Sequence, residues 1–170
     1  MEKGLVHLYW GDGKGKTTAA MGVAMRALAA GKKVVIVQFL KGQESGEITL
    51  LSRLGAQIYR GKAGQKFVFQ MTEEEKTETR KVQDENLRAA LRQPADLLIL
   101  DEACAAVQLK MADEELIKKT VCEKPTEQEL ILTGRNPADW MKAAADYSTE
   151  MHCWKHPYEK GVSARKGVEY

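Results

Sequence analysis

Short apolar runs alternate along the chain with longer segments whose apolar residues recur at helical spacing. The runs of strand length lie at residues 5–9, 33–39, 56–59, 97–100 and 129–133, with a last strand expected from residue 147. The helical patterns lie at residues 16–30, 45–54, 72–92, 113–122 and 138–145. Because strands and helices alternate, the sequence predicts an α/β fold of three layers, with a mostly parallel sheet flanked by helices.

Local signals place several helix ends. Gly31 is expected to cap the first helix, and Thr72 with Glu75 forms a capping box for the long helix that follows. Asn136 and Pro137 are expected to be the N-cap and the first helical residue of the last helix. The many charges between residues 72 and 92 are interpreted as a solvated helix face.

Length and charge narrow the function classes. A chain of 170 residues fits one domain, residues 1–170, with its own core. Its 26 Lys and Arg residues against 24 Asp and Glu residues form no basic stripe, so we expect no nucleic-acid partner. No apolar run approaches the roughly 18 residues of a membrane span, no secretory signal is visible, and the three cysteines form no CxxC pair. We therefore expect a cytoplasmic protein that crosses no membrane.

A glycine-rich turn between the first strand and the first helix has the composition of a phosphate-binding loop. Its glycines let backbone N–H groups converge on phosphate oxygens, the helix N-terminus adds a partial positive charge, and Lys16 adds a full one. The hydroxyl of Thr17 is a ligand for Mg²⁺. The residues predicted to bind ATP here are Gly11, Asp12, Gly13, Lys14, Gly15, Lys16, Thr17 and Thr18.

The loop departs from the usual spacing at its entrance. The common pattern has a glycine five residues before Gly15, where this chain has Trp10, and its first glycine is Gly11. A loop that is shortened at its entrance is therefore expected.

The buried strand at residues 97–100 is followed by Asp101 and Glu102. A carboxylate at the end of such a strand is placed to hold Mg²⁺ beside the phosphates, and helix capping is the alternative. Arg135, after the strand that ends at Thr133, is either a phosphate ligand at the same edge or a surface cation.

Several blocks together resemble the P-loop type of ATP:corrinoid adenosyltransferases, the cob(I)yrinic acid a,c-diamide or cob(I)alamin adenosyltransferase family. The blocks are GDGKGKTTAAMG from residue 11, VQFLKG from residue 37, LILDE from residue 98, ILTGR from residue 131 and GVSARKGVEY from residue 161. The shortened glycine loop is itself a trait of this family.

This resemblance implies transfer of the 5′-deoxyadenosyl group of ATP to the Co(I) centre of a corrinoid, with release of triphosphate and formation of adenosylcobalamin or an adenosylated precursor. ATP is then a co-substrate, and no general base is needed. The implied catalytic residues are Lys16 and Glu102, which position the substrate and stabilise charge. Arg26 matches an arginine at the nucleoside end of the site, with an ordinary exposed helix cation as the alternative.

The resemblance also implies a corrinoid site. Phe67 and Phe69 match a Phe-x-Trp pair whose aromatic rings displace the lower axial ligand of cobalt, with Gln38 and Lys41 as further corrinoid contacts. A short amphipathic strand packed on the core is the alternative for the two phenylalanines. Some similar enzymes carry an extra N-terminal segment over the corrinoid, so we expect corrinoid affinity or breadth to differ here.

A P-loop kinase for a small molecule and a P-loop ATPase are the rival functions. A homodimer and a flavoprotein reductase partner are implied by the resemblance. The choice among cobyrinic acid diamide, cobinamide and cobalamin stays open.

Overall fold

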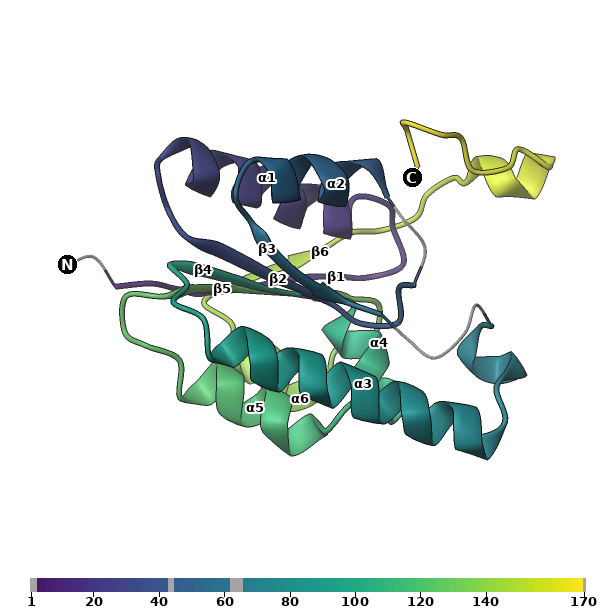
Figure 1. Ribbon diagram of the computed structural model, residues 1–170. Helices are drawn as coiled ribbons and strands as arrows, with labels where there is room; N and C mark the ends of the chain where they lie inside the picture. Colours follow the sequence, from purple (N-terminus) through teal and green to yellow (C-terminus); the bar gives the residue numbers. More distant parts are fainter. Residues whose placement is uncertain (1–2, 43–44, 62–65, 170) are drawn as a thin grey trace.

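The computed structural model describes residues 3–42, 45–61 and 66–169, which form one six-stranded sheet between two layers of helices (Figure 1). All five neighbouring strand pairs are parallel, in the order β3-β2-β4-β5-β1-β6. The strands are β1 (Val6–Trp10), β2 (Val34–Gln38), β3 (Gln57–Arg60), β4 (Leu97–Asp101), β5 (Glu129–Gly134) and β6 (Tyr147–Glu150). The predicted α/β class with a parallel sheet is confirmed.

The helices divide between the two faces of the sheet, as Figure 1 shows. One face carries α1 (Lys16–Ala29) and α2 (Gly46–Arg53). The other carries α3 (Glu73–Leu91), α4 (Ala103–Gln108), α5 (Glu114–Cys122) and α6 (Asp139–Ala144). Two short 3₁₀ helices, η1 (Val68–Gln70) and η2 (Pro157–Lys160), lie outside these layers.

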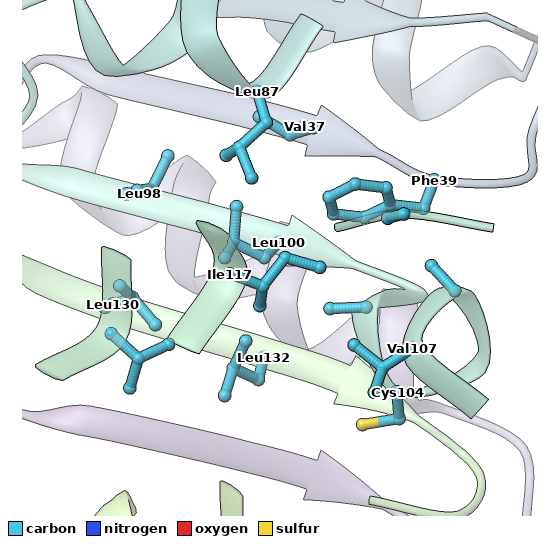
Figure 2. Packing of buried hydrophobic residues seen from close by; sticks show 14 of the residues in the cluster. Val37, Phe39, Leu87, Leu98, Leu100, Cys104, Val107, Ile117, Leu130 and Leu132 are labelled. Carbon is cyan, nitrogen blue, oxygen red and sulfur yellow. The ribbon is translucent and has the colours of Figure 1, made fainter. Parts of the chain in front are cut away.

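Alternation along the strands builds two separate cores. In β4, Leu97 and Ile99 pack beneath α1 and α2, whereas Leu98 and Leu100 pack against the helices of the opposite face. Figure 2 shows the second of these cores, with Leu98 and Leu100 beside residues from α3, α4 and α5. Since a strand that is buried on both faces reads as one continuous apolar run, this packing explains the unbroken LLIL sequence.

The Thr72 capping box is confirmed, with the Glu75 N–H donating to Oγ1 of Thr72 at 3.2 Å. The predicted start of the last helix was wrong. Helix α6 begins at Asp139 with Ala138 as its N-cap, so Asn136 lies in the preceding turn, where its side chain bonds to Gln108.

The charged helix α3 is not solvated along its whole length. Thr79, Gln83 and Asp84 are buried, in line with the apolar residues Leu87 and Ala90. The interpretation of residues 72–92 as a solvated face therefore holds for one side of the helix only. Within the described residues, none of the helices is both long enough and apolar enough to cross a membrane.

Candidate functional site

Three polar side chains meet where adjacent parallel strands end. Gln38 is opposite Asp101 in the β2–β4 register, and Thr133 ends the apolar part of β5 beside them. The period of two that sends Ile36, Ile99 and their equivalents toward α1 sends these three polar residues to the same face. All three are buried, so a polar cluster sits beneath the N-terminus of α1.

Asp101 is the centre of this cluster. Its Oδ1 accepts hydrogen bonds from Thr17 at 2.9 Å and from Thr133 at 2.7 Å. Its Oδ2 accepts from Nε2 of Gln38 at 3.0 Å and from Nζ of Lys41 at 2.7 Å. The carboxylate is completely buried, and these charge-assisted bonds are what allow an anion to remain there.

The entrance of the phosphate loop explains the displaced glycine. Trp10 is still part of β1, paired with both β5 and β6, so no turn is made at that residue. The turn begins at Gly11, whose φ of 108° favours glycine, and Gly15 has a φ of 113° directly before α1. Nζ of Lys16 folds back over the loop and donates to the carbonyl of Gly13 at 2.6 Å.

The segment after β6 crosses the first half of the loop, which the sequence did not indicate. The N–H of Gly13 donates to the carbonyl of Met151 at 2.7 Å, and the N–H of Met151 donates to the carbonyl of Trp10 at 2.7 Å. The carboxylate of Asp12 accepts from the N–H of Cys153 at 3.1 Å. A methyl group on Gly13 would lie 2.7 Å from the backbone of Met151, so this glycine is required by the crossing segment.

Charged side chains of both signs surround the loop. Glu102 has a φ of 62°, and its N–H donates to Thr133. Burial raises the pKa of the Glu102 carboxyl, Asp101 adds to the rise, and Lys41, Lys16 and Arg135 oppose it. Burial lowers the pKa of Lys16. The structure thus brings four predicted residues, Asp101, Lys41, Lys16 and Arg135, within electrostatic reach of the predicted Glu102.

Other predicted nucleotide residues lie farther out. Lys14, in the glycine-rich turn, and Thr18, in the first turn of α1, are both exposed. Arg26 lies ten residues beyond Lys16 on α1, about 15 Å along the helix axis. It lines a separate cavity of about 710 Å³ near the amino ends of β1 and β4, so the structure does not bring it to the phosphate loop.

An aromatic cavity lies close to the polar cluster. The rings of Phe67 and Phe69 are stacked with centroids 5.6 Å apart, and 65% and 82% of these residues are exposed. The alternative, that the pair forms a strand packed on the core, is therefore wrong: Phe69 lies in η1 and Phe67 directly precedes it. The cavity measures about 480 Å³ and is lined by Leu40, Phe67, Val68, Phe69, Lys76 and Leu109.

Four of these cavity residues, Leu40, Val68, Lys76 and Leu109, were not predicted from the sequence as ligand contacts. Leu40 directly precedes Lys41, so one short segment joins the cavity to Asp101. Cavities of about 610 and 710 Å³ lie at the opposite edge of the sheet, and among the described residues neither is lined by aromatic residues or by a neighbour of Lys41. Chemistry and not size therefore selects the smaller cavity.

Comparison with a family model and with curated proteins points to one family. A family model described as "ATP:corrinoid adenosyltransferase BtuR/CobO/CobP" matches residues 2–170. A corrinoid adenosyltransferase of Escherichia coli K12 is 34% identical over 99% of this chain and 87% of that protein. Corrinoid adenosyltransferases of Salmonella typhimurium and Pseudomonas aeruginosa are 32% and 31% identical over 99% of this chain, and over 87% and 85% of those proteins.

Proposed function

Because this chain belongs to the ATP:corrinoid adenosyltransferase family, we propose that it transfers the 5′-deoxyadenosyl group of ATP to a reduced corrinoid. One observation carries the placement of this reaction. The segment Leu40–Lys41 lines the aromatic cavity with its first residue and contacts the buried Asp101 with its second. The aromatic cavity, proposed for the corrinoid, and the region of Asp101 and the phosphate loop, proposed for MgATP, therefore share one wall. A transfer between a corrinoid and ATP requires the two sites to be adjacent.

In the reaction, the electron pair of Co(I) forms the bond to C5′ of the ribose. The bond between C5′ and the phosphate oxygen breaks, and its electron pair leaves with the triphosphate. Since the nucleophile carries no proton, no side chain has to act as a base. The task of the protein is to hold C5′ in line with cobalt and to stabilise the charge that develops on the leaving group.

We assign the triphosphate to the loop of residues 11–18. Lys16 has its ammonium group at the carbonyl of Gly13 and is free to turn toward an anion when one arrives. The first N–H groups of α1 have no partner within the helix and add a partial positive charge. Lys14 and Arg135 supply further cations. Glu102 interacts electrostatically with Lys16 and Arg135, and its proposed role is to position these two cations as their counter-charge.

The polar cluster fits Mg²⁺. Thr17 and Asp101 are 2.9 Å apart, and both present the oxygen ligands that this ion prefers. Oε1 of Gln38 is buried with no hydrogen-bond partner among the described residues, which suits a water of the ion's hydration shell. Thr17 and Asp101 would hold the ion, with Glu102 as a further candidate. Bound there, Mg²⁺ supplies positive charge to the leaving triphosphate.

We assign the corrinoid to the aromatic cavity. Phe67 and Phe69 present stacked, exposed rings of the kind that pack against a large planar ligand, and Leu40 and Leu109 complete an apolar wall. In this arrangement the rings replace the lower axial ligand of cobalt, which makes reduction to Co(I) easier. Gln38 and Lys41 bond to Asp101, so their role toward the corrinoid would be to hold the shared wall.

Product analysis tests the proposal. The protein is incubated with ATP, Mg²⁺ and chemically reduced cobalamin, and both nucleotide products and the light-sensitive spectrum of an adenosylcorrinoid are followed. We expect inorganic triphosphate in equal amount to the adenosylcorrinoid. ADP with a phosphorylated acceptor would indicate a kinase, and ADP with free phosphate an ATPase. Either result would overturn the assignment.

We further propose a homodimer that works in the cytoplasm with a flavoprotein reductase as electron source. Family membership supports these expectations, and light scattering on the purified protein tests the first. Activity on Co(II) substrate, with and without an added reduced flavoprotein, tests the reductase.

A further inference from the structure

Gln83 bridges two segments that are distant in the sequence. This α3 residue is 1% exposed, and its side-chain amide uses both ends. Oε1 accepts a hydrogen bond from the N–H of Leu40, after β2, and Nε2 donates to the carbonyl of Met111, after α4, at 2.6 Å. The helix thereby fixes the positions of both segments relative to each other.

Both bridged segments contain a residue in a conformation that side chains disfavour. Leu40 has a φ of 59° and Lys110 a φ of 55°, in the left-handed region that costs a non-glycine residue free energy. Such conformations persist where surrounding contacts over-determine them. The amide of Gln83 supplies one such contact to Leu40 itself and another to the residue after Lys110.

The two segments also form the wall that faces the stacked phenylalanines. Leu40 and Leu109 both line the aromatic cavity, and each lies no more than two residues from a backbone group that Gln83 binds. We propose that Gln83 is a positioning residue for the corrinoid: it holds Leu40 and Leu109 at the separation that the planar ligand needs. This inference rests on the proposed assignment of the cavity to the corrinoid.

The alternative is that Gln83 stabilises the core and has no effect on ligand binding. The amide matters in either case, because replacement by an apolar side chain leaves a buried N–H and a buried carbonyl without partners. Only the positioning role predicts a loss that is selective for the corrinoid. The phosphate loop is held by contacts to Met151 and Cys153 that do not involve α3, whereas Lys41, next to Leu40, contacts the proposed Mg²⁺ ligands Thr17 and Asp101. ATP binding in the absence of Mg²⁺ therefore offers an internal reference.

The test compares Gln83→Met, Gln83→Glu and the control Lys81→Met on the exposed side of the same helix. Cob(II)alamin is titrated in the presence of MgATP, and the four-coordinate Co(II) signal is followed by electron paramagnetic resonance. Gln83→Met removes the hydrogen bonds to both Leu40 and Met111, and we expect it to weaken corrinoid binding at least about tenfold and to reduce the four-coordinate fraction. Gln83→Glu keeps the acceptor for Leu40 and should fall between Gln83→Met and the unchanged chain. If Gln83→Met does not fold, Gln83→Glu decides the question alone.

The affinity for ATP without Mg²⁺, measured by calorimetry on the same variants, separates the outcomes. Equal losses for ATP and corrinoid, or a lower melting temperature with unchanged corrinoid binding, would overturn the positioning role. The double variant Phe67→Ala/Phe69→Ala serves as the reference for the cavity. If it retains the full four-coordinate signal, the cavity assignment fails and the inference with it. If it loses the signal while both Gln83 variants retain it, only the inference about Gln83 fails.

Discussion

The ammonium group of Lys41 lies 2.7 Å from Oδ2 of Asp101, at the spot where the carboxylate would meet a metal ion. The same ammonium is 3.3 Å from the hydroxyl of Thr17, the other proposed ligand. Lys41 is partly exposed and Asp101 is fully buried, so the lysine neutralises an anion that could not otherwise remain in the interior.

Lys41→Met should therefore destabilise the metal-free protein. A buried carboxylate that loses its ionic partner costs about 2 kcal/mol even when its other hydrogen bonds remain. The melting temperature of the variant should fall below that of the unchanged protein. MgATP should restore part of the difference, because a ligand that binds only the native state stabilises it. Lys81→Met on the exposed side of α3 is the control. Equal melting temperatures for the two variants would contradict the role of the pair.

Asp101→Asn tests the metal assignment. The amide keeps the size of the side chain but turns one acceptor into a donor that faces Thr17, Gln38 or Lys41. We expect Mn²⁺ binding in the presence of ATP, followed by electron paramagnetic resonance, to weaken by at least about tenfold. Asp139→Asn, at the exposed start of α6, should bind Mn²⁺ as the unchanged protein does. Retained Mn²⁺ binding in Asp101→Asn would remove this residue from the metal site.

Removal of both aromatic rings should slow the reduction of Co(II) to Co(I) more than the transfer of the adenosyl group to Co(I). Phe67→Ala with Phe69→Ala should slow adenosylation of Co(II) substrate with a reductase far more than that of prereduced Co(I) substrate. Leu50→Ala on the exposed side of α2 is the control for loss of a surface apolar group. Losses of the same size in both assays would reject a role in reduction.

Two glycine substitutions test whether the segment after β6 shapes the phosphate loop. One adds a methyl group against this segment, and the other adds a methyl group elsewhere as the control. Gly13→Ala places Cβ 2.7 Å from the backbone of Met151, so the segment after β6 must move and ATP affinity should fall. Gly22→Ala adds its methyl in open space within α1, and should stabilise the protein by about 0.5–1 kcal/mol. Calorimetric titration with ATP and thermal unfolding measure both effects. Wild-type ATP affinity in Gly13→Ala would show that the crossing does not shape the loop.

Tyr9 predicts a pH dependence of stability. Burial raises the pKa of its phenol above 10.0, and Glu129 adds to the rise. The folded state therefore holds the proton to a higher pH than the unfolded state, and this contribution to stability is complete below pH 10 and is lost as the pH rises further. Tyr9→Phe should lose less stability than the unchanged protein between pH 9 and 11 in urea titrations. Tyr158→Phe, in the exposed 3₁₀ helix η2, should leave the alkaline loss unaltered.

The fold could be predicted from the sequence because most elements carried two independent signals: a pattern of apolar residues along the element and a characteristic residue at one end. The apolar run of β4 ends in Asp101, and the apolar pattern of α3 begins at a capping box. Helix α4 carried neither signal and was missed. It has six residues, its N-cap is Glu102 with a φ of 62° and no side-chain cap, and its Ala-rich sequence has no polar face that would reveal a helical period.

The candidate site was predicted in its composition more than in its contacts. The loop and Asp101 were predicted from local spacing, and the phenylalanine pair from its match to a Phe-x-Trp pair in similar enzymes. The role of Gln83 depends on hydrogen bonds to Leu40 and Met111, which lie 43 and 28 residues away in the sequence. Met151, directly after β6, bonds to Trp10 and Gly13, which are still more distant. No local sequence pattern encodes such contacts. In α3, Gln83 is spaced four residues from both Thr79 and Leu87, which places it on the same side of the helix as Leu87. This spacing was the available sign in the sequence that Gln83 is buried.

The position of β1 between β5 and β6 has a consequence for how the chain acquires its shape during synthesis. The first strand finds both of its neighbours more than a hundred residues downstream, as the 140-residue separation between Val6 and its bonding partner Asp146 illustrates. Contacts of such range close late, because a long loop must be ordered first. The phosphate loop leaves the ribosome more than a hundred residues before β5 and β6, yet it gains its neighbours only when β6 has been made. A nascent chain should therefore be unable to retain nucleotide until β6 has left the ribosome.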